Sequence, residues 1–226
     1  MVGATSRVTF LYELDDLGRS KKSVPLSSGG GDTVRAVAFA DEDTVIVGDD
    51  HGRVVRWRIG ETPHSDMLIS EGTAITSLLV RNGRLLVGRG DEVDSIELNS
   101  TANEVVTISK GFGWIDSLAL SDDGKRLAVG YADGSIGVFA TDQPSTQPII
   151  LNVHGDIVRA LAFDRAGDTL VSVGDDGIIK STAVGETRLG DLACKMLWRD
   201  LSQEEITSYF GSTLPPTIPS CPNQAQ

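Results

Sequence analysis

The sequence predicts an all-β protein built from repeated four-stranded units, and three observations support this fold class. A six-residue segment of alternating apolar residues recurs four times at nearly constant spacing. Each copy is followed by a polar turn and by a β-rich run that ends in glycine. Tight glycine-containing turns then lead into a third apolar segment in most of the units. Several copies of these features in the same order indicate an internal repeat.

The first two strands of each unit are the most regular part of the repeat. The alternating segments are residues 34–39, 75–80, 115–120 and 158–163, and their starts lie 41, 40 and 43 residues apart. The glycine-ended runs that follow are residues 44–48, 84–88, 126–130 and 168–174. Alternation at a period of two is the pattern of a strand with one buried face. Each unit therefore begins with two paired strands.

The third and fourth strands are marked by turns and by weaker apolar segments. Glycine follows His51, Asp133 and Asp176, and glycine tolerates the positive φ that tight hairpin turns need. In the unit of residues 84–98, Glu92 stands where the turn glycine is expected. Third strands are expected at residues 54–59, 135–139 and 178–182, and fourth strands at residues 67–69, 105–108 and 148–151. Four short strands per about 40–45 residues is typical of a β-propeller blade.

The number of blades is small. Residues 7–14 and 23–26 are expected to form the third and fourth strands of a partial blade, and the unit that starts at residue 157 supplies three strands. The chain thus divides into a two-strand partial blade with a connector (1–31), the repeated blades (32–185) and a tail (186–226). Three explanations stay open: the C-terminal piece of a longer protein, a small ring of about four to five blades closed by the N-terminal strands, or part of an oligomeric ring. Open blade edges would favour self-association.

The tail has a different period. Leu189, Leu192, Ala193, Met196 and Leu197 are spaced as the apolar stripe of an amphipathic helix. The segment 202–205 has the pattern of a capping box for a second helix. The proline-rich residues 214–219 are compatible with neither a helix nor an inner strand. A short helical tail with a proline-rich end is therefore expected.

Composition and charge exclude several classes of partner. The chain has 226 residues and a net charge of −12, from 20 basic and 32 acidic residues. Such an acidic balance does not favour nucleic acid or an anionic membrane surface. Neither a signal peptide nor a run of about 18 apolar residues is present, which predicts a cytoplasmic protein. With no phosphate-binding loop motif and no metal-ligand spacing among the histidines, no cofactor or metal is expected. Whether Cys194 and Cys221 are bonded stays open.

The last unit carries the features by which the chain resembles the WD-repeat proteins. His154 stands at the position of the Gly-His histidine of that family, Ser172 on the second strand and Asp176 in the turn before the third. The resemblance implies that these three side chains form a buried hydrogen-bond relay. In the family a tryptophan on the third strand completes it, and here that position holds Trp57 in one unit, Phe139 in another and Thr182 in the last. The resemblance covers about residues 5–185.

The tail also resembles a known protein ending. Ala193-Cys194, Arg199-Asp200-Leu201-Ser202, Glu204-Glu205, Ile206, Tyr209 and Cys221-Pro222 are similar to the C-terminal end of bacterial signal-transduction ATPases with numerous domains, the STAND proteins (NACHT/NB-ARC-like), that carry a WD-repeat sensor. The resemblance implies a sensor module. The partner would then be another protein or the N-terminal domains of the same protein, which this sequence does not contain.

Propellers bind partners mostly through loops at one end, and here these are the loops before the first strands and between the second and third strands. The candidate protein-binding residues on this rim are Phe112, Trp114, Tyr131, Arg89, Asp50, His51, Asp133 and Asp156. An exposed tryptophan and tyrosine among charges is typical of interaction hot spots. The predicted function is a non-enzymatic protein-interaction scaffold or sensor. The alternatives are a lactonase-like or other propeller hydrolase and a gene remnant of a larger ATPase.

Overall fold

The computed structural model describes residues 2–5, 8–14, 16, 18–26, 33–60, 62–100, 102–142 and 147–185. Within these ranges every regular element is a β-strand, and the strands form five antiparallel sheets, here called blades 1 to 5. The all-β fold class is therefore confirmed. The predicted tail helices and the two cysteines lie outside the described residues.

Each blade is formed by consecutive strands. Blade 1 contains β1 (Val2–Thr5), β2 (Val8–Leu14) and β3 (Ser20–Leu26). Blade 2 contains β4 (Val34–Phe39), β5 (Thr44–Asp49), β6 (Val54–Arg58) and β7 (His64–Ile69). Blade 3 contains β8 (Ile75–Arg81), β9 (Arg84–Arg89), β10 (Glu92–Glu97) and β11 (Val105–Lys110). Blade 4 contains β12 (Ile115–Leu120), β13 (Arg126–Tyr131), β14 (Ser135–Ala140) and β15 (Ile149–Asn152), and blade 5 contains β16 (Val158–Phe163), β17 (Thr169–Gly174) and β18 (Ile179–Ala183).

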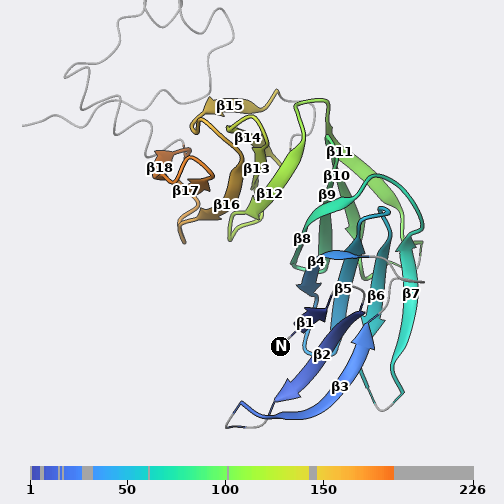
Figure 1. Ribbon diagram of the computed structural model, residues 1–226. Coiled ribbons are helices and arrows are strands. Elements are labelled where there is room, and N and C mark those ends of the chain that lie inside the picture. The colour runs from blue at the N-terminus through green and yellow to red at the C-terminus, as the bar shows by residue number, and fades with distance from the viewer. Residues whose placement is uncertain are drawn as a thin grey trace, which may run out of the picture.

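The blades stand side by side in an open, propeller-like arc (Figure 1). The first strands of blades 2 to 5 contact one another in succession, from β4 to β8, β12 and β16, and form the inside of the arc. Among the described strands, none of blade 1 pairs with any of blade 5. Closure of a small ring by the N-terminal strands is thus wrong for this structure, because those strands pair with each other instead.

Two details differ from the predicted strands. Blade 1 has a further strand, β1, which pairs with β2 and which is too short and glycine-containing to show alternation in the sequence. In blade 3, Glu92 is the first residue of β10 rather than a turn residue, because Gly90 and Asp91 form a tighter, two-residue turn. Gly90 adopts a φ of 55°, which favours glycine. The expected division of the chain at residues 31 and 185 stays a prediction.

The hydrophobic core lies between neighbouring blades. Ile46 of β5 packs against Leu85 and Val87 of β9, for example, and all three side chains are fully buried. Similar clusters join blades 1 and 2, blades 3 and 4, and blades 4 and 5. Each buried aliphatic side chain contributes about 1.5–3 kcal/mol relative to exposure. A blade therefore depends on its neighbours for most of its stability.

A glycine near the end of the second strand allows these blades to approach closely. In blades 2 to 4 it faces the first residue of the next blade's inner strand. The pairs, with the distance from an ideally placed Cβ to the facing side chain, are Gly48 and Ile75 (2.6 Å), Gly88 and Ile115 (3.0 Å), and Gly130 and Val158 (2.8 Å). Any side chain at these positions would overlap the neighbouring blade. The glycine that ends each of the first three predicted runs is thus a packing requirement.

Candidate functional site

The loops at one end of the strands are joined by backbone hydrogen bonds into a continuous rim. Within a blade, the loop before the first strand bonds the turn between the second and third: Ala132 N donates to Trp114 O at 2.8 Å. Between blades, His154 N donates to Gly134 O at 3.0 Å. Equivalent bonds join Asp50 to Thr33, Gly72 to His51, Ile115 to Gly90 and Asp175 to Ile157. The predicted grouping of these loops at one end matches this arrangement, and the bonds make the rim a fixed platform.

Two aromatic side chains of the rim are exposed. Trp114, in the loop before β12, is 52% exposed, although its backbone is held by Ala132. Phe112 is 38% exposed, and its ring packs edge-on against Phe139 with the ring centres 5.8 Å apart. An exposed tryptophan on a fixed backbone loses little conformational entropy on binding, which suits an interface anchor.

Two of the expected rim residues do not face solvent. Tyr131 is 1% exposed and packs between blades 3 and 4 with Val93 and Ile115, so its placement on the binding surface is wrong. Burial raises the pKa of Tyr131 to about 12. The Arg89 side chain is mostly buried: its Nε donates to the buried Asp94 carboxylate at 2.6 Å, with Glu92 also close. Its charge is used within blade 3 and is not available to a partner.

The other charged residues of the predicted rim lie at its surface. His51, Asp133 and Asp156 are exposed, and Asp50 is half-buried. Asp50 accepts a hydrogen bond from the Thr33 amide at 3.1 Å and lies 2.9 Å from the His51 ring nitrogen Nδ1. Asp133 and Asp156 belong to the rim loops of blades 4 and 5, as Trp114 does, and can supply polar groups beside an interface there, whereas Asp50 and His51 lie on the rim of blade 2.

Sequence reasoning missed one recurring polar position on the inner strands. The pairing between the first and second strands shifts by one residue in each of blades 2 to 5, which leaves an extra residue near the rim. These residues are Arg35, Thr76, Asp116 and Arg159. Arg159 bonds Asp116 of blade 4 at 3.0 Å and Asp175 of its own blade at 2.6 Å. The polar residue after the first apolar residue of each repeat is the signal that could have identified them.

The structure brings the three residues of the expected relay together. The imidazole of His154 is buried, with Nδ1 3.0 Å from an Asp176 carboxylate oxygen and Nε2 2.8 Å from the Ser172 hydroxyl. Because a carboxylate only accepts, Nδ1 is the donor in the hydrogen bond to Asp176. Desolvation acts to raise the pKa of Asp176. Hydrogen bonds from Ile178, Gly155 and His154 together outweigh this effect, so the pKa lies below its usual 3.8. This site ties the loop before β16 to the β17–β18 turn.

Several turn carboxylates make stability depend on pH in the same direction. Hydrogen bonds from the hydroxyl and amide of Ser135 hold the pKa of Asp133 below its usual 3.8. The groups with lowered pKa are Asp50, Asp66, Glu92, Asp123, Asp133, Asp164, Asp175 and Asp176. Such a group stabilises the fold above its unfolded-state pKa, and the stabilisation is lost as the pH falls through the folded-state value.

Acid is therefore expected to lower the melting temperature, with the fall concentrated below about pH 4. Thermal unfolding of the wild type and of Asp133→Asn, measured from about pH 6 to about pH 2, checks this. The variant lacks one of the titrating groups, so its melting temperature should fall less over the same interval. Equal falls in the two proteins would contradict a role of Asp133 in acid sensitivity.

Two further places in the described part hold polar groups that could in principle form a site. Asp49, Asp50 and His51 offer ligand atoms within 4.8 Å of one another, but Asp49 is paired with Arg53 at 2.7 Å. The four inner strands contain one carboxylate, Asp116, which pairs with Arg159. A hydrolase would need several acid, base or metal-binding groups converging there, so this arrangement does not favour the enzyme alternative.

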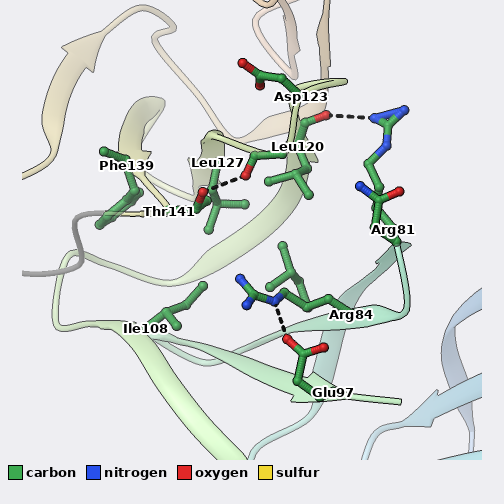
Figure 2. A pocket seen from close by; sticks show the side chains of 13 residues that line it. Arg81, Arg84, Glu97, Ile108, Leu120, Asp123, Leu127, Phe139 and Thr141 are labelled. Atoms are coloured by element: carbon green, nitrogen blue, oxygen red, sulfur yellow. Dashed lines mark hydrogen bonds and ion pairs between the residues drawn. The ribbon is translucent and has the colours of Figure 1, made fainter. Parts of the chain in front are cut away.

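A cavity of about 340 Å³ lies between blades 3 and 4, at the end of the strands opposite the rim. Figure 2 shows the side chains that line it. Leu86, Leu120, Leu127 and Phe139 are among its apolar lining residues. At its mouth Arg84 Nε donates to Glu97 at 2.7 Å. Arg81 bonds Asp122 and the backbone carbonyl of Leu120. The cavity therefore has an apolar floor and a charged border, which includes the Asp123 carboxylate as well as these ion pairs.

The described strands form a propeller-like array of antiparallel blades, and part of this array matches a known repeat family. The family described as "WD domain, G-beta repeat" matches residues 103–139 and 145–181. Each match contains the outer strand of one blade followed by the first three strands of the next. The sequence repeat and the blade are therefore out of phase, and each repeat links two sheets. Among the described residues no helix is long and apolar enough to cross a membrane.

Two curated relatives match parts of the chain, and one of them is named as a WD repeat-containing protein. The chain is 25% identical over 187 residues to the ciliary WD repeat-containing protein ctxp80 of Euplotoides octocarinatus, covering 72% of this chain and 26% of that protein. It is 38% identical over 61 residues to the DDB1- and CUL4-associated factor 11 homolog of Caenorhabditis briggsae, covering 26% of this chain and 11% of that protein. The aligned part thus spans about a quarter or less of these relatives.

Solved structures support the fold. The computationally designed Ika8 protein superposes with a TM-score of 0.59 at 20% identity, over 81% of this chain and 57% of that one. The designed Ika4 protein superposes with a TM-score of 0.54 at 21% identity, over 70% of this chain and 94% of that one. At this level of identity the similarity concerns the fold alone.

Proposed function

We propose that this chain is a non-enzymatic protein-interaction module whose partner binds the rim around Trp114. The observation that carries the proposal is the exposure of the Trp114 side chain on a backbone held by hydrogen bonds. Phe112 extends the apolar surface, and Asp133 and Asp156 lie exposed on the same rim. An apolar anchor surrounded by polar residues is the usual composition of a protein-binding surface.

The relatives support the same class of function. The Caenorhabditis briggsae protein is named as a factor associated with DDB1 and CUL4. Its aligned segment is short, so the proposal takes from it a general role in protein association and not these particular partners. The described inner strands supply no converging catalytic groups, which agrees with a binding function.

Replacing Trp114 by alanine is expected to weaken partner binding strongly and to leave stability almost unchanged. Removing a central tryptophan from an interface costs about 2 kcal/mol or more, a weakening of about thirtyfold or more. Because the side chain is half exposed, the free energy of unfolding should change by about 0.5 kcal/mol or less. The test is quantitative affinity capture from the native host, followed by titration of the captured protein.

Phe39→Ala is the matched control. Phe39 is 51% exposed and ends β4 at the opposite end of an inner strand. A partner retained by the wild type and by Phe39→Ala, and lost by Trp114→Ala, supports the proposal. Equal retention by all three proteins would show that the rim at Trp114 is not the binding surface.

A narrower form of the proposal makes the module the cytoplasmic sensor of a bacterial STAND-type signalling protein. Support for it comes from the similarity of tail residues 193–222 to the ending of such proteins. The partner would then include the nucleotide-binding domains of the same protein. An in-frame nucleotide-binding domain encoded upstream would support this form, and its absence from the gene would contradict it.

A further inference from the structure

The outer face of blade 5 is uncovered at the positions that are buried in the other blades. On the second strand, Ile46, Leu86 and Ala128 are buried against the next blade, and the residue in the same register of blade 5 is Val171, which is exposed. On the third strand, Val54, Val93 and Ile136 are 0% exposed, whereas the equivalent Ile179 is 72% exposed. Ala160 and Ala162 of β16 are exposed as well. Together these residues, with Val173, form the blade 5 face.

The blade 5 face is not shaped for a further blade of the same kind. Blades 2 to 4 hold a glycine where the next blade's inner strand approaches, and blade 5 holds Val173 in the same register. A Cβ at the equivalent Gly130 would lie only 2.8 Å from Val158 of the following strand. Val173 would overlap a blade that packed in this way. The face is apolar, yet it needs an occupant with a different surface.

We propose that tail residues 189–197 cover the blade 5 face as an amphipathic helix. The described part ends with Val184 and Gly185, whose amides bond Asp168 at the start of blade 5, and 41 residues follow. Residues 186–188 can reach about 10 Å. A nine-residue helix is about 13 Å long, which fits across strands of about 20 Å.

The composition of the tail segment supports this occupant. Leu189, Leu192, Ala193, Met196 and Leu197 recur at helical spacing and would present one continuous apolar face. A further blade would have to bring its inner strand against Val173, whereas a helix would not. The flexible side chain of Met196 can adapt to an irregular apolar surface. A helix of this kind would close the end of the array, as terminal repeats must be capped for solubility.

Hydrogen exchange of the full chain tests the proposal. In the wild type, the amides of residues 189–197 should exchange about tenfold or more slowly than in an unstructured peptide. Ile179→Asp should remove this protection and leave the amides of blade 4 protected, and Leu192→Asp should have the same effect from the side of the tail. Ile149→Asp is the matched control, since Ile149 is 53% exposed on blade 4 and should leave the tail protected.

Three outcomes of the exchange experiment would overturn the proposal: no protection of residues 189–197 in the wild type, protection that survives Ile179→Asp, or loss of protection in Ile149→Asp. A second copy of the chain is the competing occupant. Disulfide formation between cysteines introduced by Ile179→Cys and Met196→Cys, with Cys194 and Cys221 replaced by serine, distinguishes the two. A cross-linked monomer supports the tail as occupant, whereas a cross-linked dimer overturns it. This test is independent of whether a partner binds the rim.

Discussion

Tyr131→Ala is expected to lower the free energy of unfolding by about 3–5 kcal/mol. Tyr131 is fully buried between blades 3 and 4, where it packs with Leu86, Val93 and Ile115. Glycines at 113 and 137 leave room for its ring, so alanine would open a cavity that the backbone cannot fill easily. The loss would affect the contact on which both blades depend.

Chemical denaturation of the wild type, Tyr131→Ala and Trp114→Ala measures this difference. The tryptophan variant serves as the control, because it removes an aromatic side chain of the same region that is exposed. If Tyr131→Ala unfolds at a denaturant concentration close to that of the wild type and also loses partner binding, Tyr131 would be part of the binding surface after all. We expect the reverse, since the burial of its side chain leaves no atom to contact a partner.

Gly130→Val is expected to cost about 3 kcal/mol. The new Cβ would overlap Val158 of blade 5 and the hydroxyl of Ser117. That hydroxyl donates to Val158 O at 2.7 Å in a buried position, and this bond would be lost with the packing. Blade 5 would consequently separate from blade 4 before the rest of the array unfolds.

Val173→Gly is the matched control, because it changes the same position of the repeat in the opposite sense. Val173 faces no following blade, so its replacement by glycine creates no overlap, and any loss of stability comes only from the contacts of its side chain on the blade 5 face and from the backbone freedom of glycine. Hydrogen exchange resolved by blade would show loss of protection in blade 5 for Gly130→Val only. Similar stability of Gly130→Val and the wild type would contradict a packing role for this glycine.

The spacing of the repeats was sufficient to predict the four-stranded blades, because alternation and turn glycines are local properties. The same information misplaced Arg89 and Tyr131 for one shared reason. Both directly follow the glycine at which the second strand was expected to end, and in the structure each strand continues by one residue. That residue lies between blades, where burial depends on the neighbouring sheet.

The polar relay shows the opposite case. Ser172 lies 18 residues after His154 in the sequence, and Asp176 lies 22 residues after it. No local sequence pattern brings these residues together. Their resemblance to a known family supplied the grouping. By contrast, β1 could not be predicted, since a four-residue strand with a glycine acquires its structure from pairing with β2.

The glycine positions also limit how the number of repeats in such a chain can change. If a duplicated repeat were inserted after blade 2, 3 or 4, its inner strand would face a glycine of the preceding blade. It could pack there without any further substitution. A repeat added after blade 5 would meet Val173 and would need a second change, to glycine, before it could be accommodated. Lengthening this array by gene duplication, or by protein engineering, is therefore expected to succeed within the array first and at its end only with that substitution.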